Sequence, residues 1–486
     1  MIESIKKTTL YLFQSIVSSI FGLVLLMIST HYLTPDELGQ FALIQVWVVF
    51  SSTLANFGLK AGYERNFFVY EKTDKSAQLL HSAVLFVAVN LIIIFGFLCI
   101  FESDIEQLIS INLSQSHLLL WIFLGIALSE LSEYYLIFLK NTGLASRYVQ
   151  LTLIRTIANF IVAAVLLHFA QLKVLSLAYG MLISNFLLLL MLVYYQKSHF
   201  SFNKKLLMEM LKISLPLTPR LFLGVLSSKL DKIMLGVVGS TSMVGVYHIA
   251  QSIAYLVFQV VVALDMVFKP EFHRKLFANK HQNNSSEIND YILPFFYLSI
   301  FVALLFGLFS ADILTIFFSD KYVNLPEVVI ILSINYTVIF FGIITGSQLI
   351  QAKKASIIVY LALFSVIIGF ILNAIFIPYW GVFGAAWAVT ITAAISTIMS
   401  FLFAQKYIKI YWDLKSIFMA YTVCLFSMAF SLLNAMDVVN INGYLLLFSK
   451  IFLVFMYIYV SSLNTVNRRI FNTFKEIRSQ KNNNAN

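Results

Sequence analysis

Charged residues are scarce in this sequence, and their scarcity excludes a soluble globular protein. Only 12% of the 486 residues are Asp, Glu, Lys or Arg, whereas 60% are hydrophobic and the mean hydropathy is +0.87. A soluble domain carries about 25% charged residues. Apolar runs longer than about 18 residues recur from one end of the chain to the other. The sequence therefore predicts an all-α polytopic membrane protein.

Cysteine is almost absent, and sequence features of enzymes are missing. Cys99 and Cys424 each lie in the middle of an apolar run, which excludes a disulfide framework and a zinc site. No Asp-x-Asp pair occurs, and the polar loops are too short for a catalytic domain. The first apolar run, Thr8–Ser29, is too long for a signal peptide, so we interpret it as a retained helix. We expect no enzyme activity, catalytic residue, metal or cofactor.

The apolar runs divide into fourteen predicted membrane-spanning helices. They occupy residues 8–30, 38–59, 80–101, 116–139, 149–169, 174–195, 213–238, 243–268, 291–310, 325–350, 356–376, 382–404, 415–434 and 444–463. Basic residues are distributed very unevenly among the connections. One alternate set of connections and termini carries 26 of the 33 Lys and Arg residues, and the other carries only Lys173 and Lys321. By the positive-inside rule, both termini are cytoplasmic. The net charge of +10 therefore indicates membrane orientation and contact with anionic lipids, not nucleic-acid binding.

An internal repeat organises the predicted helices. Leu38–Gln45 and Val244–Gln251 share a glycine, an aromatic residue and a glutamine at an offset of 206 residues, and each block opens the second helix of a pair. We predict two six-helix lobes in a parallel pseudo-two-fold repeat around a central cavity. The predicted division is residues 1–200, 201–410, two appended helices at 411–466, and a partly disordered cytoplasmic tail at 467–486. A substrate site commonly lies between two such lobes.

Ionisable side chains are concentrated in the predicted pair of helices at residues 213–268. Charges at membrane depth are expensive and normally face a bundle interior or a wet cavity. Pro216 and Pro219 in the first helix would free backbone carbonyl groups. Polar residues of this pair, together with a stripe in the equivalent helix of the first lobe, are the predicted substrate pathway. They are Arg220, Lys229, Asp231, Lys232, Gln251, Tyr255, Gln259, Gln45, Ser52 and Asn56. Interhelical hydrogen bonding is the alternative interpretation of the two polar stripes.

Four further ionisable residues are candidates for ion coupling or for a latch between helices. They are Glu130, Glu133, Arg155 and Asp265. Residues at equal depth in neighbouring helices can pair, which predicts the pairs Glu133–Arg155 and Arg220–Asp265 as structural contacts or state-dependent latches. Glu130 has no evident partner at its own depth, so it is the best candidate for a carboxyl group that binds a proton. Coupling to a proton or sodium gradient remains open.

Several segments resemble the multidrug/oligosaccharidyl-lipid/polysaccharide exporter superfamily, and within it the Wzx-type polysaccharide flippases. The segments are Tyr32–Ala42, Pro216 with Leu230–Lys232, Val244–Tyr247 and Pro378–Ala388. The resemblance implies two lobes around a cavity and export of an undecaprenyl-pyrophosphate-linked oligosaccharide by alternating access.

The same resemblance implies the surroundings of the protein. It suggests the bacterial cytoplasmic (inner) membrane, a role in O-antigen or lipopolysaccharide biosynthesis, and polysaccharide polymerase and chain-length regulator proteins as partners. Two alternatives are an ion-coupled drug or cation antiporter of the same superfamily and a membrane polysaccharide polymerase. A polymerase normally needs a sizeable outer loop, and this sequence has none.

Overall fold

The structure is a computed structural model, and all of its regular elements are helices. It describes residues 2–70, 73, 75–108, 117–196, 200–282, 285–322, 325–435 and 443–464. Within these ranges, twelve helices are long and apolar enough to cross a membrane. The chain is therefore a multi-pass membrane protein. The predicted disordered tail at 467–486 lies outside the described residues.

The chain divides into two compact units by its contacts. Unit 1 comprises Met1–Ile249 and Val366–Ala385, and unit 2 comprises Ala250–Ser365 and Ala386–Asn486. These boundaries differ from the predicted lobe boundaries at residues 200 and 410, and the division into two lobes stays a prediction.

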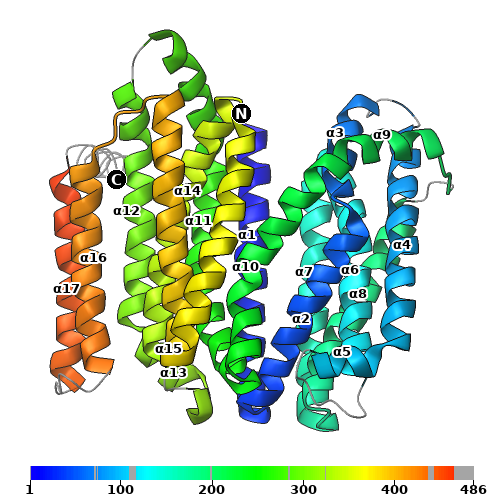
Figure 1. Ribbon diagram of the computed structural model, residues 1–486, viewed down its shortest axis with the longest axis horizontal. Helices are drawn as coiled ribbons and strands as arrows, with labels where there is room; N and C mark the ends of the chain where they lie inside the picture. Colours follow the sequence, from blue (N-terminus) through cyan, green and yellow to red (C-terminus); the bar gives the residue numbers. More distant parts are fainter. Residues whose placement is uncertain are drawn as a thin grey trace, which may run out of the picture. The chain divides into compact units, whose positions relative to one another are not determined.

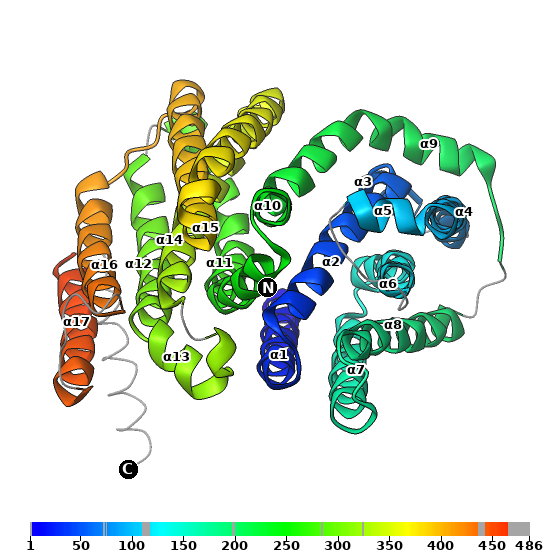
Figure 2. The same cartoon turned by 60° about the horizontal axis from the view of Figure 1, so that its bottom comes forward.

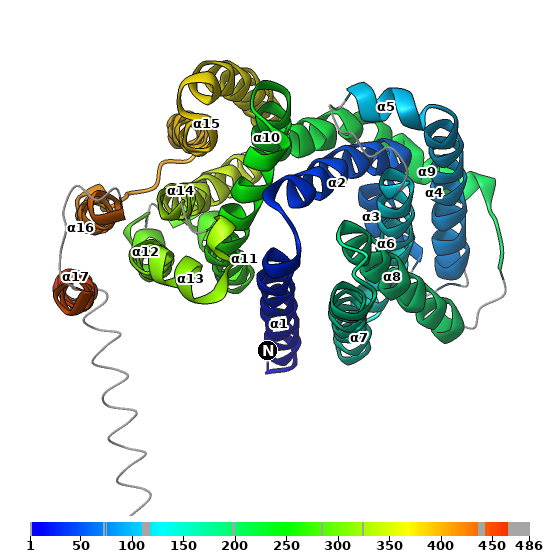
Figure 3. The ribbon, with the colours of Figure 1, turned by 90° about the horizontal axis from the view of Figure 1, so that it is seen from below.

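Among the described residues, ten α-helices lie wholly in unit 1. They are α1 (Ile2–Tyr32), α2 (Pro35–Asn56), α3 (Leu59–Tyr70), α4 (Lys75–Ile100), α5 (Glu102–Leu108), α6 (Leu118–Asn141), α7 (Ala145–Val165), α8 (Val174–Gln196), α9 (Lys204–Ser214) and α10 (Thr218–Val238). Two short helices, η1 (Leu166–Ala170) and η2 (Leu215–Leu217), follow α7 and α9. α8 packs between α6 and α7, and α1 packs on α7 (Figures 1 and 3). Tyr63 of α3 and Tyr134 of α6 are fully buried, with ring centroids 5.6 Å apart.

Unit 2 contains the later helices. They are most of α11 (Thr241–Gln282), α12 (Ser285–Leu308), α13 (Ser310–Phe317), η3 (Asp320–Tyr322), α14 (Pro326–Gln351), parts of α15 (Ala355–Tyr407), α16 (Leu414–Ala435) and α17 (Gly443–Leu463). α12 packs against α14 and α16, and α16 and α17 lie side by side (Figures 1 and 3). Phe296 and Phe340 are buried between α12 and α14, with ring centroids 5.1 Å apart.

The long helix α15 is interrupted at a glycine. Gly381 has φ 54° and ψ −128°, which is outside the helical region and favours a residue without a Cβ atom. The hydroxyl groups of Ser365 and Ser396, 31 residues apart on either side of this break, lie 2.5 Å from each other. α15 is therefore two helices that fold back on each other, as the predicted boundaries 356–376 and 382–404 require.

The start of α2 explains the sequence motif that follows the first span. Thr34 is the N-cap of α2, and its hydroxyl group accepts a hydrogen bond from the Glu37 backbone amide. The Glu37 carboxylate in turn accepts a hydrogen bond from the Thr34 backbone amide, which completes a capping box. Pro35 occupies the first turn, where its missing N–H group has no helical partner. The motif therefore fixes where α2 begins.

Candidate functional site

Two prolines divide the segment that the sequence predicts as one helix at 213–238. α9 ends at Ser214, the short 3-10 helix η2 contains Pro216, and α10 begins at Thr218 with Pro219 in its first turn. Proline cannot donate the helical N–H bond and clashes with the preceding turn, so it belongs at a helix start and not in its interior. The predicted continuous helix is wrong at its first five residues, because α10 begins only at Thr218.

The corner between α2 and α3 holds this break in place. Phe57 and Gly58 have φ of 46° and 64°, so the chain turns sharply after α2. The Thr218 hydroxyl group donates to the Phe57 carbonyl oxygen at 2.9 Å. The Gly62 amide donates to the Ser214 hydroxyl oxygen at 3.2 Å, and a Cβ atom on Gly62 would lie 2.3 Å from that oxygen. The start of α10 is therefore fixed to α3 by close backbone contact.

A pocket opens along one face of α10, entirely within unit 1. Its volume is about 560 Å³, and its lining is apolar apart from one arginine and one serine. The lining residues are Ala61 of α3 and Leu217, Arg220, Leu221, Gly224, Val225 and Ser228. Their spacing of three or four residues is that of a single helical face. This repeated spacing is the sequence signal that could have identified the pocket, whereas the predicted pathway residues of this helix are all ionisable.

Arg220 is the only charged side chain that lines this pocket. Among the described residues of unit 1, no carboxylate forms an ion pair with its guanidinium group. Lys229 lies nine residues further on, about 180° around the helix, and does not line the pocket. A guanidinium group in an apolar pocket can bind a carboxylate or phosphate with two parallel hydrogen bonds.

Asp231 and Lys232 of α10 belong to a buried polar cluster on α10 and α11. The Tyr247 hydroxyl group donates to the Asp231 carboxylate at 2.6 Å, and the Lys232 backbone amide donates to the same carboxylate at 2.8 Å. Lys232 Nζ lies 2.9 Å from His248 Nδ1. Asp231, Lys232 and Tyr247 are 2%, 6% and 0% exposed. The predicted pathway residues Asp231 and Lys232 thus contact α11 and do not line the pocket.

The two repeat glycines contact each other. A Cβ atom on Gly39 would lie 1.7 Å from the Thr241 carbonyl oxygen, and one on Gly245 would lie 1.9 Å from the Pro35 carbonyl oxygen. Residues 35 and 241 are separated by the same 206 residues as the two glycines. The contact is therefore reciprocal, as a pseudo-two-fold axis between the beginnings of α2 and α11 requires. The Thr241 hydroxyl group also donates to the Asp36 carboxylate.

The predicted polar stripe of α2 makes contacts within unit 1. Gln45 donates to the Met181 sulfur of α8 at 3.9 Å. Ser52 is 1% exposed, and its hydroxyl group donates to its own helix. Asn56 is 6% exposed and accepts a hydrogen bond of 2.5 Å from the Tyr134 hydroxyl group. The Gln45 and Asn56 contacts join different helices and the Ser52 contact is intrahelical, and the role of this stripe in a pathway stays a prediction.

The prediction that Glu130 lacks a partner is wrong. Its carboxylate pairs with Lys60 Nζ at 2.8 Å and accepts a hydrogen bond from the Asn56 amide group at 3.0 Å. Lys60 lies on α3, in one of the basic connections that follow from the distribution of Lys and Arg. Because this lysine reaches a carboxylate inside the helix bundle, Glu130 loses its distinguishing feature as a coupling group.

The polar residues of α11 lie in unit 2. Gln251 and Gln259 are half-buried, and the Tyr255 ring, 42% exposed, packs against Tyr336 with centroids 6.1 Å apart. Asp265 pairs with Lys269, one turn further along α11, at 3.1 Å. This intrahelical pair gives Asp265 a cation other than the predicted Arg220, and the Arg220–Asp265 pair stays a prediction.

The predicted pair Glu133–Arg155 is not an ion pair in the described residues. The Glu133 and Arg155 side chains each interact electrostatically with Tyr148 of α7, so both lie near the same aromatic side chain. Equal depth in the two helices is therefore not sufficient for direct contact, because the side chains must also face each other around the helix axes.

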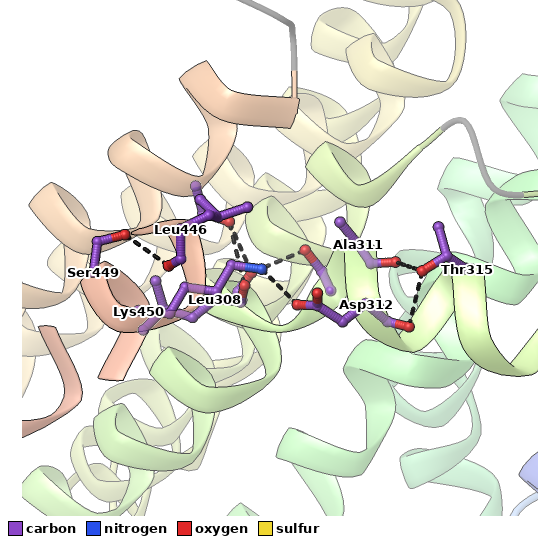
Figure 4. Close-up of polar contacts among 10 residues, drawn as sticks. Leu308, Ala311, Asp312, Thr315, Leu446, Ser449 and Lys450 are labelled. Carbon is purple, nitrogen blue, oxygen red and sulfur yellow. Dashed lines mark hydrogen bonds and ion pairs between the residues drawn. The ribbon is translucent and has the colours of Figure 1, made fainter. Parts of the chain in front are cut away.

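A buried lysine joins α17 to the short helix α13 in unit 2. Lys450, whose side chain is 4% exposed, pairs with Asp312 at 2.5 Å, and its Nζ atom lies 5.5 Å from the centre of the Phe309 ring. Figure 4 shows Lys450 extending from α17 toward the Asp312 carboxylate. Lys450 lies within the predicted span 444–463, where the sequence indicates no partner for it. The pair attaches α17 to α13.

Across the described ranges, no group of three or more His, Cys, Asp or Glu side chains is placed to hold a metal ion. The groups that the pocket presents are one guanidinium group, one hydroxyl group and apolar side chains.

Three comparisons identify related proteins. The chain is 23% identical over 446 residues to the probable low-salt glycan biosynthesis flippase Agl15 of Haloferax volcanii, and this match covers 90% of the chain and 91% of the relative. A solved structure of the lipid II flippase MurJ, in an inward closed conformation, matches 93% of this chain and 97% of its own with a TM-score of 0.73 and 15% identity. A solved structure of an inward-facing multidrug resistance MATE family transporter of the MOP superfamily matches 80% of this chain and 94% of its own, with a TM-score of 0.66 and 14% identity.

The structural similarities show that the fold is of the MOP transporter type. The model of the polysaccharide biosynthesis protein family matches residues 4–276, which is more than half of the chain and includes α1 through most of α11. This protein therefore belongs to the polysaccharide biosynthesis protein family.

Proposed function

We propose that this protein is a flippase that carries a lipid-linked oligosaccharide across a membrane by alternating access and has no enzyme activity. The substrate class that we propose is an undecaprenyl-pyrophosphate-linked oligosaccharide repeat unit. The observation that carries the proposal is Arg220, an arginine without an ion pair among the described residues, in a pocket whose other lining residues are apolar except for Ser228. Family membership and the glycan flippase relative support the broader assignment to glycan transport in polysaccharide biosynthesis.

The energetics of the substrate explain why such a site is needed. A pyrophosphate group loses its water on entering hydrocarbon, and an uncompensated charge there is prohibitively unfavourable. A guanidinium group replaces part of that hydration with charge-assisted hydrogen bonds. The apolar lining from Leu217, Leu221 and Val225 suits the first carbons of a lipid chain. The pocket thus combines the two chemistries that meet in a polyprenyl pyrophosphate.

The pairing of acids favours an anionic substrate over a cationic one. Glu130 and Asp265 are paired with Lys60 and Lys269, which lie outside the group of charges predicted at membrane depth. Arg220 is thereby left available to an anion. A drug or cation antiporter, which the multidrug transporter fold supports as the alternative, would need an accessible carboxylate in this position. A membrane polysaccharide polymerase is a less favoured alternative because no described element supplies a catalytic site.

The proposal includes fourteen spans with both termini in the cytoplasm. Two additions to the twelve apolar helices support this number. The 52-residue stretch Ser356–Tyr407, counted once among the twelve, is two helices around Gly381. The 21-residue α10 is not among the twelve because it contains four charged residues, but it is long enough to be counted as a further span. The unequal distribution of Lys and Arg supports the orientation. We place the protein in a bacterial cytoplasmic membrane, in O-antigen or lipopolysaccharide biosynthesis, with a polymerase and a chain-length regulator as partners.

Alternating access requires that contacts at the ends of the helices open and close. The reciprocal contact between Gly39 and Gly245 joins the beginnings of α2 and α11, and the basic connections place this end on the outer side. In the proposed cycle this contact separates when the substrate leaves to the outside. A proton or sodium gradient is the proposed energy source, without a bound cofactor.

Reconstituted vesicles test this proposal. A fluorescent lipid-linked oligosaccharide is incorporated with the purified protein, and the rate at which its headgroup becomes accessible to an impermeant quencher is measured. We expect transport by the wild type and by Arg147→Gln, an exposed control arginine on α7, and little transport by Arg220→Gln. Arg220→Lys should retain part of the activity because the charge remains. Equal rates in all four proteins, or export of a cationic dye in place of the glycolipid, would contradict the proposal.

A further inference from the structure

The short helix α9 is amphipathic and lies across the ends of neighbouring helices. Figures 1 and 2 show it running across α3 and α4, instead of alongside them, before the chain turns into α10. Its buried side is formed by Leu206, Leu207, Met210 and Ser214. These residues recur at helical spacing and pack toward α3 and α4. The opposite side of α9 is therefore presented outward along its whole length.

The outward side of α9 is basic. Lys204, Lys205 and Lys212 are all exposed, and they lie within about 100° of one another around the helix, with Met208 among them. No ion pair joins any of the three lysines to an acid in the described ranges. The one acid of α9 is Glu209. Its carboxylate accepts a hydrogen bond of 2.8 Å from the hydroxyl group of Tyr70, a residue of α3 whose pKa this bond raises.

Exposed apolar side chains accompany these lysines. Phe200 and Phe202, just before α9, are 64% and 48% exposed, and Met208 is 57% exposed. The segment is nevertheless firmly held. The Asn203 side-chain oxygen caps α9 by accepting hydrogen bonds from the Lys205 and Leu206 backbone amides. The Asn203 backbone amide donates to the Ser82 hydroxyl oxygen at 2.9 Å. The apolar side chains are therefore held outward by the structure around them.

We propose that α9, together with Phe200 and Phe202, is a binding surface for anionic phospholipid headgroups of the membrane in which the protein lies. Helices that lie in the membrane interface combine lysines with aromatic and aliphatic side chains in this way. The three lysines complement phosphate groups, and the apolar side chains insert at the level of the upper acyl chains. A soluble acidic protein would match the lysines but would not use the exposed phenylalanines.

This surface has a direct structural link to the pocket. α9 continues through η2 into α10, and Gly62 of α3 contacts Ser214 at the junction. Lipid binding at α9 would therefore fix the depth of the first turn of α10, which carries Arg220. The proposal concerns the bulk lipid of the membrane and does not depend on which substrate the pocket binds.

A spin-label experiment on the full chain tests this inference. The label is attached to Met208→Cys in a Cys99→Ser background, and the protein is reconstituted in phosphatidylcholine vesicles with or without phosphatidylglycerol. The accessibility of the label to oxygen and to a water-soluble nickel complex is then compared. We expect phosphatidylglycerol to raise the accessibility of the label to oxygen relative to the nickel complex, which indicates that the label has moved into the membrane interface. Changing all three lysines to glutamine should abolish this shift. Each single change should lower the affinity for the anionic lipid by about fivefold and make the shift smaller.

Two controls make the outcome decisive. Lys321→Gln, which removes an exposed lysine of η3, should leave the shift unchanged. Inorganic pyrophosphate at matched ionic strength should not displace the label if the partner is the lipid surface. Equal accessibility in both vesicles, an unaltered shift in the triple glutamine variant, loss of the shift in Lys321→Gln, or displacement by pyrophosphate would each overturn the proposal. Because no glycan is present, the result is independent of the proposed transport activity.

Discussion

The two helical hairpins α1–α2 and α10–α11 have the same framework and different chemistry. α1 ends at Tyr32 and α10 ends at Val238, and α2 and α11 begin at Pro35 and Thr241. The two helix ends are 206 residues apart and so are the two helix starts, which is the offset of the sequence repeat. The reciprocal glycine contact relates the beginnings of their second helices. Within the described spans, however, only the second hairpin brings Arg, Lys and Asp together in its first helix.

The buried polar cluster replaces apolar residues of the first hairpin. The equivalent positions are Leu25 for Asp231, Leu26 for Lys232, Phe41 for Tyr247 and Ala42 for His248. Leu25 and Phe41 are 8% and 6% exposed, so the first hairpin buries apolar side chains where the second buries hydrogen-bonded polar ones. The polar residues occur as contacting pairs, Asp231 with Tyr247, and this pairing makes their burial tolerable.

The pocket arginine also has a neutral counterpart. Gln14 occupies the position equivalent to Arg220, and its amide group donates to the Ser18 hydroxyl oxygen at 3.0 Å. Ser18 in turn contacts Thr156 of α7 at 2.9 Å. The first hairpin thus uses its polar residues to pack against a neighbouring helix, whereas the second exposes a charge to a pocket. Under the proposed function, both hairpins share the architecture of the repeat, and we expect only the second to contribute to recognition of the substrate.

The largest expected effect comes from removing one member of the buried cluster. Asp231→Leu leaves the Tyr247 hydroxyl group and the Lys232 backbone amide without their acceptor and removes a buried carboxylate beside Lys232, which should lower the free energy of unfolding by about 3–5 kcal/mol. Grafting all four first-hairpin residues, with Lys232→Leu, Tyr247→Phe and His248→Ala added, should recover most of this loss. Thermal unfolding in detergent micelles measures both. A graft as unstable as the single variant would show that the hairpins are not equivalent at these positions.

A smaller effect is expected at the shared glycine contact. Gly39→Ala and Gly245→Ala each place a methyl group against a backbone carbonyl, which should lower the free energy of unfolding by about 1–3 kcal/mol. The two losses should be similar because the contact is reciprocal. Gly22→Ala in α1, where no atom lies within 4 Å of the added Cβ, is the matched control and should not destabilise the protein. Unequal losses from the two glycines would weaken the proposed pseudo-two-fold relation.

The smallest effect is expected at the charged pair of the first half. Lys60→Met removes the partner of Glu130, but the two side chains are 34% and 22% exposed, so water can solvate the remaining carboxylate. We expect a loss of at most about 1 kcal/mol in the free energy of unfolding. A loss as large as that of Asp231→Leu would show that Glu130 is effectively buried, and would restore it as a candidate for ion coupling.

The helices and the repeat could be predicted from the sequence because both depend on strong local patterns. Long apolar runs identify spans, and Gly39 and Gly245 stand out because the same residue types surround both. The break between Ser214 and Thr218 was missed although Pro216 and Pro219 were noticed. Hydropathy continues smoothly through this break, whereas the backbone geometry does not.

Side-chain partners could not be predicted because they depend on rotation around helix axes and on short elements outside the spans. Lys60 lies just beyond the predicted span 38–59, but α3 brings its amine to Glu130. Lys269 lies one turn from Asp265, a local pairing that the search for interhelical partners overlooked. Arg220 was identified as a candidate, and its pocket became visible only with the apolar residues that line the same face of α10.

Binding of a lipid-linked pyrophosphate oligosaccharide to the purified protein is the most direct test of recognition by the second hairpin. We predict that Arg220→Gln, which copies the first hairpin, weakens the apparent affinity about tenfold to a hundredfold, as expected for loss of a hydrogen bond to a charged group. The reverse change, Gln14→Arg, should not restore affinity when added to Arg220→Gln. Unchanged affinity in Arg220→Gln, with the protein folded as the wild type is, would contradict the assignment of the pocket to the anionic headgroup.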